Sequence, residues 1–243
     1  MQAHPLLSRR PHRPAPAVIL GHGATLSLAR LHEGCGPARR SFAMLLAAQM
    51  LAGPAVSGMD GGTSGGRSGA TSGGAIWDGP IWWIAPAWQS DQLHAEGVAS
   101  FIPPERLIFV RPKRAEDVLW TLEEILRSGT ARLAVADIPG LPSLTAVRRL
   151  HLAAETGAEN GPAPLGLILT PGPGGAQGVE SRWHCAPDHA AGQPGWRLDR
   201  LRARMDPPRS WRATWGGQDP QNGSRRAGLT LTPAPPQTEP AMA

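Results

Sequence analysis

The stretch RLIFVRPKRAEDVLWTLEEILRSGTARLAVAD, residues 106–137, contains two short apolar runs separated by a longer amphipathic segment. The runs at 106–110 and 132–137 predict buried strands, because each is short, continuous and rich in apolar residues. Between them, apolar residues at three- and four-residue spacing predict a helix that ends at Gly129. Parallel strands need such a crossover, so the stretch predicts an α/β fold with a mostly parallel sheet.

The same alternation extends in both directions along the chain. Apolar runs at 81–85 and 165–170 predict two more buried strands. Helical spacing predicts a helix that starts at Ser41, a short helix capped by Ser90 and a longer helix capped by Ser143. Strands and helices that alternate in this way indicate a single α/β domain.

Beyond the last predicted parallel strand, polar and apolar residues alternate one by one, which is typical of antiparallel strands. Trp211, Ala213 and Trp215 share one face of the final strand of this region. In the strand before it, the alternation slips between Leu198 and Leu201, which predicts a β-bulge. The C-terminal part of the domain is therefore expected to be an antiparallel extension of the sheet.

Glycine and proline divide the chain into segments. The 243 residues include 30 Gly and 26 Pro, concentrated near both ends and in one internal run. We expect residues 1–28 to form a disordered or partly ordered Arg/Pro-rich segment and 29–215 to form the domain. A flexible Gly/Ser-rich insertion is expected at 54–78, and a disordered tail at 216–243.

Composition restricts the class of protein. The 24 Lys and Arg against 19 Asp and Glu give a net charge of +5, which alone is weak support for nucleic-acid contact. Cys35 and Cys185 have no partner spacing, which favours a reduced, cytoplasmic protein. Apolar runs fall far short of the roughly 20 residues of a membrane-spanning helix, so no membrane association is expected. Strand alternation turns His184 and Cys185 to opposite faces and the sequence offers no second ligand pair, so we expect no bound metal. No cofactor is expected either.

Residues 34–41, GCGPARRS, match the phosphate-binding loop Gly-x-x-x-x-Gly-Lys-Ser/Thr with two substitutions. A side chain at Arg39, in place of the second glycine, obstructs the close approach of backbone to phosphate. The planar guanidinium of Arg40 replaces the ammonium of the lysine. The sequence thus predicts a degenerate, inactive nucleotide site made of Gly34, Arg39, Arg40, Ser41 and Asp137. A chance match, and an ordinary loop acid at Asp137, are the alternatives.

Several segments carry a family resemblance: RLHEG (30–34), WWIAP (82–86), LIFVRPKRAEDVLWTLEEILRSG (107–129), AVRRLHLAAETG (146–157) and WRLDRLRARMDPPRSWRATW (196–215). In these segments and in its order of elements the chain resembles the RecA-type P-loop core, and within that superfamily the ImuA family, whose relatives include RecA and SulA-like proteins. The resemblance implies a RecA-like core with C-terminal antiparallel strands and a degenerate phosphate loop. Where RecA-like ATPases carry a catalytic glutamate, this chain has Ala87.

The resemblance to ImuA implies a function that is not catalytic. It implies an accessory or adaptor protein in SOS-induced, error-prone translesion DNA synthesis and DNA repair. The implied partners are a translesion-polymerase-like protein and an error-prone replicative polymerase subunit. The RecA filament is a third candidate, and DNA is expected to be contacted indirectly. A weakly active RecA-like ATPase and a SulA-like inhibitor of cell division are the alternatives.

Two further segments bear on binding. The arginine-rich segment 197–212 is a candidate partner or DNA surface, with a solvated strand face as the alternative. Its candidate contact residues are Arg200, Arg202, Arg204, Trp211 and Trp215. The glycine-rich segment 171–178 carries no basic or aromatic residue that would hold single-stranded DNA, so we expect a disordered connection there.

Overall fold

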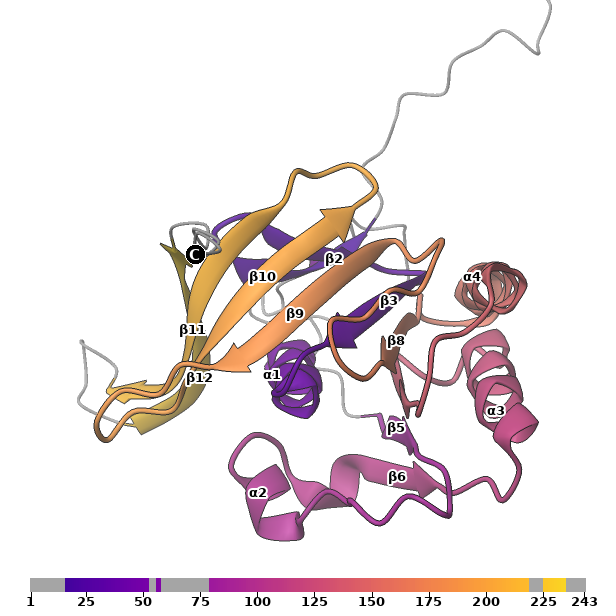
Figure 1. Cartoon of the computed structure of the whole chain (residues 1–243), viewed down its shortest axis with the longest axis horizontal. Coiled ribbons are helices and arrows are strands. Elements are labelled where there is room, and N and C mark those ends of the chain that lie inside the picture. Colours follow the sequence, from indigo (N-terminus) through magenta and orange to yellow (C-terminus); the bar gives the residue numbers. More distant parts are fainter. Residues whose placement is uncertain (1–15, 53–55, 58–78, 219–224, 235–243) are drawn as a thin grey trace, which may run out of the picture.

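The computed structural model describes residues 16–52, 56–57, 79–218 and 225–234 (Figure 1). In chain order the strands are β1 (Ala17–Gly21), β2 (Ala24–Ser27), β3 (Arg30–Cys35), β4 (Val56–Ser57), β5 (Ile81–Ile84), β6 (Leu107–Val110), β7 (Leu133–Asp137), β8 (Leu165–Leu169), β9 (Ser181–Pro187), β10 (Gly195–Ala203), β11 (Arg209–Gln218) and β12 (Arg225–Ala234). The helices are α1 (Arg39–Leu51), α2 (Ala95–Ala99), α3 (Ala115–Arg127) and α4 (Leu144–Asn160), with a 3-10 turn at Pro104–Arg106.

The main sheet has the order β12-β11-β10-β9-β3-β8-β7-β5-β6. From β9 through β3 to β6, every neighbouring pair is parallel. From β9 to β12, every neighbouring pair is antiparallel. The predicted α/β architecture, a mostly parallel sheet continued by C-terminal antiparallel strands, is confirmed. The two halves meet at β9, which pairs parallel with β3 on one side and antiparallel with β10 on the other.

Two hydrophobic cores lie on opposite faces of the main sheet. Strand β7 shows how they arise, because Leu133 and Val135 join the core on the α1 face while Ala134 and Ala136 join the core on the other face. On that second face α3 and α4 pack side by side (Figure 1). The parallel strands are buried on both sides, which explains why their sequences are continuously apolar.

The strongest helix predictions are confirmed. Helix α3 ends next to Gly129, whose φ of 71° is the left-handed conformation that glycine adopts without strain. At the start of α4, the Ser143 hydroxyl accepts a hydrogen bond from the Ala146 amide at 3.2 Å. The predicted Ser90 cap is wrong, because α2 begins only at Ala95 and has no side-chain cap. The predicted bulge is confirmed by a register shift between Arg200 and Arg202 of β10.

The domain extends beyond the expected 29–215. Strands β1 and β2, within the segment expected to be at most partly ordered, form a small sheet with β4. Val18 and Leu26 of this small sheet are buried in the same core as α1. The tail prediction is wrong for β12, which pairs with β11 and buries Leu231 against that core. Most of the expected insertion, 58–78, lies outside the described residues, as do 1–15 and 235–243.

No helix among the described residues combines the length and the apolar character needed to cross a membrane. The longest, α4, carries charged residues on its outer side, including Arg148, Arg149 and Glu155. Its amphipathic pattern is that of a helix packed on a sheet.

Candidate functional site

The segment that resembles a phosphate loop is a tight connection between β3 and α1. Gly34, expected to begin the loop, lies inside β3 and pairs with Leu169 of β8 and Trp183 of β9. A Cβ at this position would lie 3.0 Å from Leu169 and 3.1 Å from Phe42, so packing of the core explains the glycine. Only Gly36, Pro37 and Ala38 remain to connect the strand to the helix.

Backbone amides of this connection already have protein partners. The Gly36 amide donates to the Gly172 carbonyl at 2.9 Å, and the Ala38 amide donates to the Cys185 carbonyl at 3.0 Å. The Arg39 amide donates to the Gly36 carbonyl at 3.3 Å, and Pro37 has no amide hydrogen. A phosphate loop works by directing free backbone amides at the phosphates, and here these donors are engaged.

Both arginines of the segment turn to Asp137 at the carboxyl end of β7. Arg40 Nε donates to Asp137 Oδ2 at 2.6 Å, and Arg39 Nη2 lies 3.6 Å from Asp137 Oδ1. Gln89, on the connection after β5, donates from Nε2 to Asp137 Oδ2 at 3.2 Å. The structure thus places Arg39, Arg40 and Asp137 of the predicted site next to one another. It adds Gln89, which nothing local in the sequence marks.

The arginines occupy the place where the degenerate site would hold a ligand. A guanidinium bonded to the carboxylate of Asp137 supplies the positive charge that Mg²⁺ would otherwise bring to it. The space beside Arg40 and Asp137 measures about 20 Å³, close to the room needed by one water molecule. Ser41, within the first turn of α1, is partly buried. The geometry favours a closed structural cluster over a nucleotide site, which needs several hundred Å³.

The Asp137 cluster is incompletely satisfied. Asp137 is 1% exposed, and its Oδ1 has no hydrogen-bond partner among the described residues. Arg39 Nε is also buried without a partner in the described part of the chain. A buried polar atom without a hydrogen-bond partner lowers the free energy of unfolding. The ion pairs of this cluster therefore stabilise the fold less than fully hydrogen-bonded ion pairs would.

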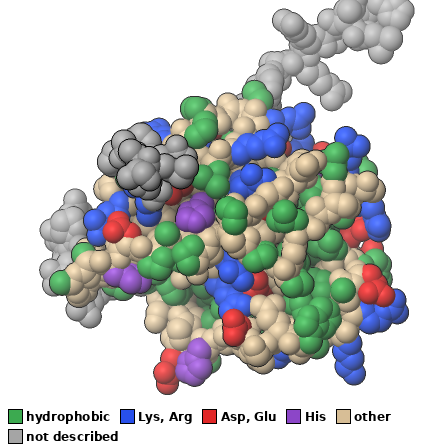
Figure 2. All heavy atoms as spheres, viewed as in Figure 1, with side chains coloured by type: hydrophobic (Ala, Val, Ile, Leu, Met, Phe, Trp, Pro, Cys, Tyr) green, Lys and Arg blue, Asp and Glu red, His purple; other side chains and the backbone are tan. Residues whose placement is uncertain are grey.

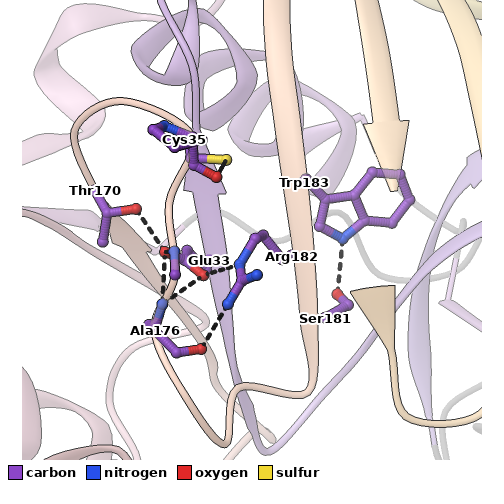
Figure 3. Close-up of polar contacts among 9 residues, drawn as sticks. Glu33, Cys35, Thr170, Ala176, Ser181, Arg182 and Trp183 are labelled. Atoms are coloured by element: carbon purple, nitrogen blue, oxygen red, sulfur yellow. Dashed lines mark hydrogen bonds and ion pairs between the residues drawn. The ribbon is translucent and has the colours of Figure 1, made fainter. Parts of the chain in front are cut away.

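A second buried carboxylate, Glu33 of β3, is fully bonded (Figure 3). Glu33 is 0% exposed and accepts hydrogen bonds from the Thr170 hydroxyl at 2.6 Å and the Gly175 amide at 2.9 Å. The Ala176 amide donates to both oxygens, at 3.1 and 3.2 Å. Arg182 Nε lies 2.5 Å from Oε2, and its Nη2 donates to the Ala176 carbonyl at 2.9 Å. Apart from the charged residue inside an apolar strand, nothing in the sequence indicated this role.

Glu33 orders the glycine-rich segment 171–178. The prediction of a disordered connection is wrong, because the segment folds over Glu33 and supplies two backbone amides to it. Gly174, with a φ of 76°, passes so close that a Cβ would lie 2.8 Å from Glu33 Oε1. The Cys35 thiol also donates to the Pro173 carbonyl at 3.2 Å. Burial raises the pKa of Cys35 to about 12, so this thiol stays protonated and unreactive.

The arginine-rich candidate surface divides into a buried part and an exposed part. Arg200 is 3% exposed, with its guanidinium 5.3 Å from the ring of Trp211 and 5.7 Å from that of Trp183. Trp211 is fully buried and Trp215 is 8% exposed, and each indole donates a hydrogen bond to a backbone carbonyl. Arg200, Trp211 and Trp215 are therefore core residues, which corrects the prediction of surface contacts for them. Arg202 and Arg204 are exposed.

The reason for this division is the bulge. Trp196, Leu198 and Arg200 alternate on the buried face of β10. Because Leu201 is left out of the pairing with β9, Arg202 does not continue that buried face. Arg200 turns inward, where Asp206 and the Pro207 carbonyl accept from its guanidinium. Alternation with Trp196 and Leu198 already places Arg200 on the inner face, and the structure adds the polar groups that its guanidinium meets there.

Comparison with known proteins adds little to this geometry. No protein-family model matches the chain, and no curated protein matches it. Among solved structures, SulA from Pseudomonas aeruginosa is similar over 39% of this chain and 72% of that chain. The sequence identity is 23% and the TM-score is 0.32. A similarity of that size carries no conclusion about activity or partners.

Proposed function

We propose that this protein is a non-catalytic accessory or adaptor protein in SOS-induced, error-prone translesion DNA synthesis and DNA repair, acting in the cytoplasm. The proposal rests on the resemblance of five sequence segments to the ImuA family and on the α/β architecture that those segments build. It includes no cofactor, because the remnant of the phosphate loop is engaged within the protein.

The observation that carries the non-catalytic part is the Arg40–Asp137 pair at 2.6 Å. In an ATPase of this type the loop lysine holds the phosphates and the acid on the neighbouring strand holds Mg²⁺. Here the residues at those two positions are bonded to each other. Ala87, where the resemblance implies a catalytic glutamate, has no side chain that could position water.

The partners that follow from the proposal are proteins. They are a translesion-polymerase-like protein and an error-prone replicative polymerase subunit, with the RecA filament as a third. An α/β body without turnover can act through its surfaces alone, and it would contact DNA through these partners. The buried side of the arginine-rich segment is excluded as a contact surface, because Arg200 and Trp211 lie in the core.

The test is co-purification of the full-length protein with each partner, with and without single-stranded DNA. The adaptor proposal expects a stable complex with the polymerase-like protein and no dependence on ATP. Failure to bind any of the three partners would contradict it. Overexpression in undamaged cells separates the SulA-like alternative, since a division inhibitor produces filamentous cells and an adaptor does not.

A further inference from the structure

A groove of about 650 Å³ opens between α4 and the carboxyl end of β10. We call it the α4 groove and define it by Leu144, Arg148 and Leu152 on one wall, Arg202–Arg204 on the other and Gly178–Glu180 between them. Figure 2 shows basic side chains in the upper right of the molecule, where Figure 1 places the end of β10 above α4. The volume is in the range of ordinary binding sites.

The floor of the α4 groove is fixed by hydrogen bonds. The Leu31 amide donates to His151 Nδ1 at 3.3 Å, so Nε2 carries the hydrogen and donates to the Gly178 carbonyl at 3.0 Å. Burial lowers the pKa of His151, which keeps the ring in this neutral form. The Arg204 amide donates to the Glu180 carbonyl at 3.0 Å, which joins the far wall to the floor. The groove therefore exists before any partner binds.

Its charges are unevenly matched. Four arginines line the groove against two glutamates. Both glutamates are engaged by one arginine, because Arg30 forms ion pairs with Glu155 and, at 3.8 Å, with Glu180. Arg148, Arg202 and Arg204 are exposed and form no ion pair with any residue in the described part of the chain. Three uncompensated guanidinium groups around one groove are complementary to an anionic occupant.

The same groove has apolar contact area on α4. Leu144 and Leu152 are 37% and 62% exposed, and they stand one turn before and one turn after Arg148 on the same side of the helix. An occupant thus meets alternating apolar and basic side chains along α4. This stripe is about 12 Å long, which matches about four residues of extended peptide.

The lining of the groove distinguishes between two kinds of anionic ligand, single-stranded nucleic acid and an acidic peptide. Single-stranded nucleic acid binds through stacking of bases on aromatic rings as well as through charge. No Phe, Tyr or Trp lines the groove, and the one ring there, that of His151, is held in the floor by hydrogen bonds at both nitrogens. An acidic peptide places discrete carboxylates against the arginines and an apolar side chain against the leucines. We infer that the α4 groove is the docking site for a short acidic segment, containing an apolar residue, of a partner protein.

The experiment measures binding of a labelled peptide about ten residues long, with glutamates flanking a leucine, by fluorescence anisotropy to the full-length protein. Arg148→Ala with Arg202→Ala should weaken binding about tenfold or more. Lys113→Glu is the matched control, because it changes the net charge by the same amount at an exposed site outside the groove. It should change the affinity less than about twofold.

A second pair of variants tests the apolar contact. Leu152→Ala should weaken binding about threefold or more, whereas Leu201→Ala, also exposed but outside the groove, should not. Circular dichroism checks that each variant is folded. The inference is overturned if the peptide shows no saturable binding, if a charge-reversed lysine peptide binds equally well, or if Lys113→Glu weakens binding as much as the double variant. Tighter binding of single-stranded DNA that is lost in the double variant also overturns it.

Discussion

Glu33 and Asp137 are both buried carboxylates in parallel strands of one sheet, and both bind arginine, yet they are built in opposite ways. Backbone amides from 171–178, a hydroxyl and Arg182 together satisfy both oxygens of Glu33. Side chains alone hold Asp137, and its Oδ1 has an ion pair with Arg39 but no hydrogen-bond partner among the described residues. The bonds to Glu33 hold the 171–178 segment in place, whereas the arginines around Asp137 occupy the space beside its carboxylate.

The difference follows from what each neighbouring loop supplies. Glycines with positive φ let the 171–178 segment turn its amides inward, toward Glu33. At the β3–α1 connection the amides are bonded elsewhere, so long arginine side chains reach Asp137 instead. Rigid backbone donors lose little entropy on bonding, whereas arginine side chains lose much more. Glu33 should therefore matter more to stability than Asp137.

The largest expected effect is that of Glu33→Gln. The substitution keeps the shape but leaves Arg182 without its buried anion and turns an amide donor toward groups that also donate. We expect the free energy of unfolding to fall by about 4 kcal/mol, as when one member of a buried pair is removed. Urea denaturation measures it, with Glu155→Gln as the exposed control at about 0.5 kcal/mol or less. Equal losses in the two variants would contradict the role assigned to Glu33.

His32, next to Glu33 in β3, makes the stability of this region depend on pH. It is 1% exposed, with Nε2 donating to the Ser27 carbonyl at 2.9 Å and Nδ1 accepting from the Ser181 hydroxyl at 2.6 Å. Trp183 Nε1 donates to the same hydroxyl at 2.7 Å (Figure 3). Because that hydroxyl in turn donates to Nδ1, the chain of hydrogen bonds is complete only when His32 is neutral. Burial, aided by His151 and Arg30, lowers the pKa of His32 to about 4.

Because the folded pKa lies below the unfolded one, protons bind more readily to the unfolded chain. The contribution of His32 is complete above about pH 6.5 and is lost as the pH falls toward 4, by on the order of 3 kcal/mol. Urea midpoints measured between pH 7 and 4 report the loss. His32→Gln should be less stable at pH 7 but have a flatter pH profile. An unchanged profile in that variant would rule out His32 as the source.

Asp137→Asn should have a smaller effect than Glu33→Gln. The side chains of Arg39 and Arg40 are 23% and 25% exposed, so water can replace part of what they lose. We expect a decrease of about 1 to 2 kcal/mol in the free energy of unfolding. Asp91→Asn, an exposed acid near the same cluster, is the control and should have almost no effect. A loss as large as that of Glu33→Gln would reverse the comparison between the two carboxylates.

The smallest expected effect is that of nucleotide. ATP with Mg²⁺ should shift the melting temperature of the protein by less than about 1 °C, because ligand binding stabilises only where a site exists. The variant Arg39→Gly with Arg40→Lys restores the motif letters but not the engaged amides of Gly36 and Ala38, so it should also show no saturable shift. Saturable stabilisation of the unmodified protein would favour the ATPase alternative instead.

Local sequence patterns determined much of the fold. The continuous apolar runs, the helical spacing of α3 and α4, the Ser143 cap and the bulge in β10 all depend on residues close together in the chain. Such features are readable because the periods of helix and strand are set by backbone geometry. One local prediction was wrong: Ser90 does not cap α2, which begins only at Ala95.

Tertiary structure decided the rest, because it depends on contacts across long sequence separations. The pairing of β12 with β11 ordered a segment whose composition predicts disorder. Glu33 and Arg182 are 149 residues apart, and Arg40 and Asp137 are 97 apart. Sequence alone determined that the chain is an α/β protein with a mostly parallel sheet and C-terminal antiparallel strands. Only folding decided that Asp137 pairs with Arg40 and that Glu33 pairs with Arg182, since burial and ion pairing are set by neighbours in space.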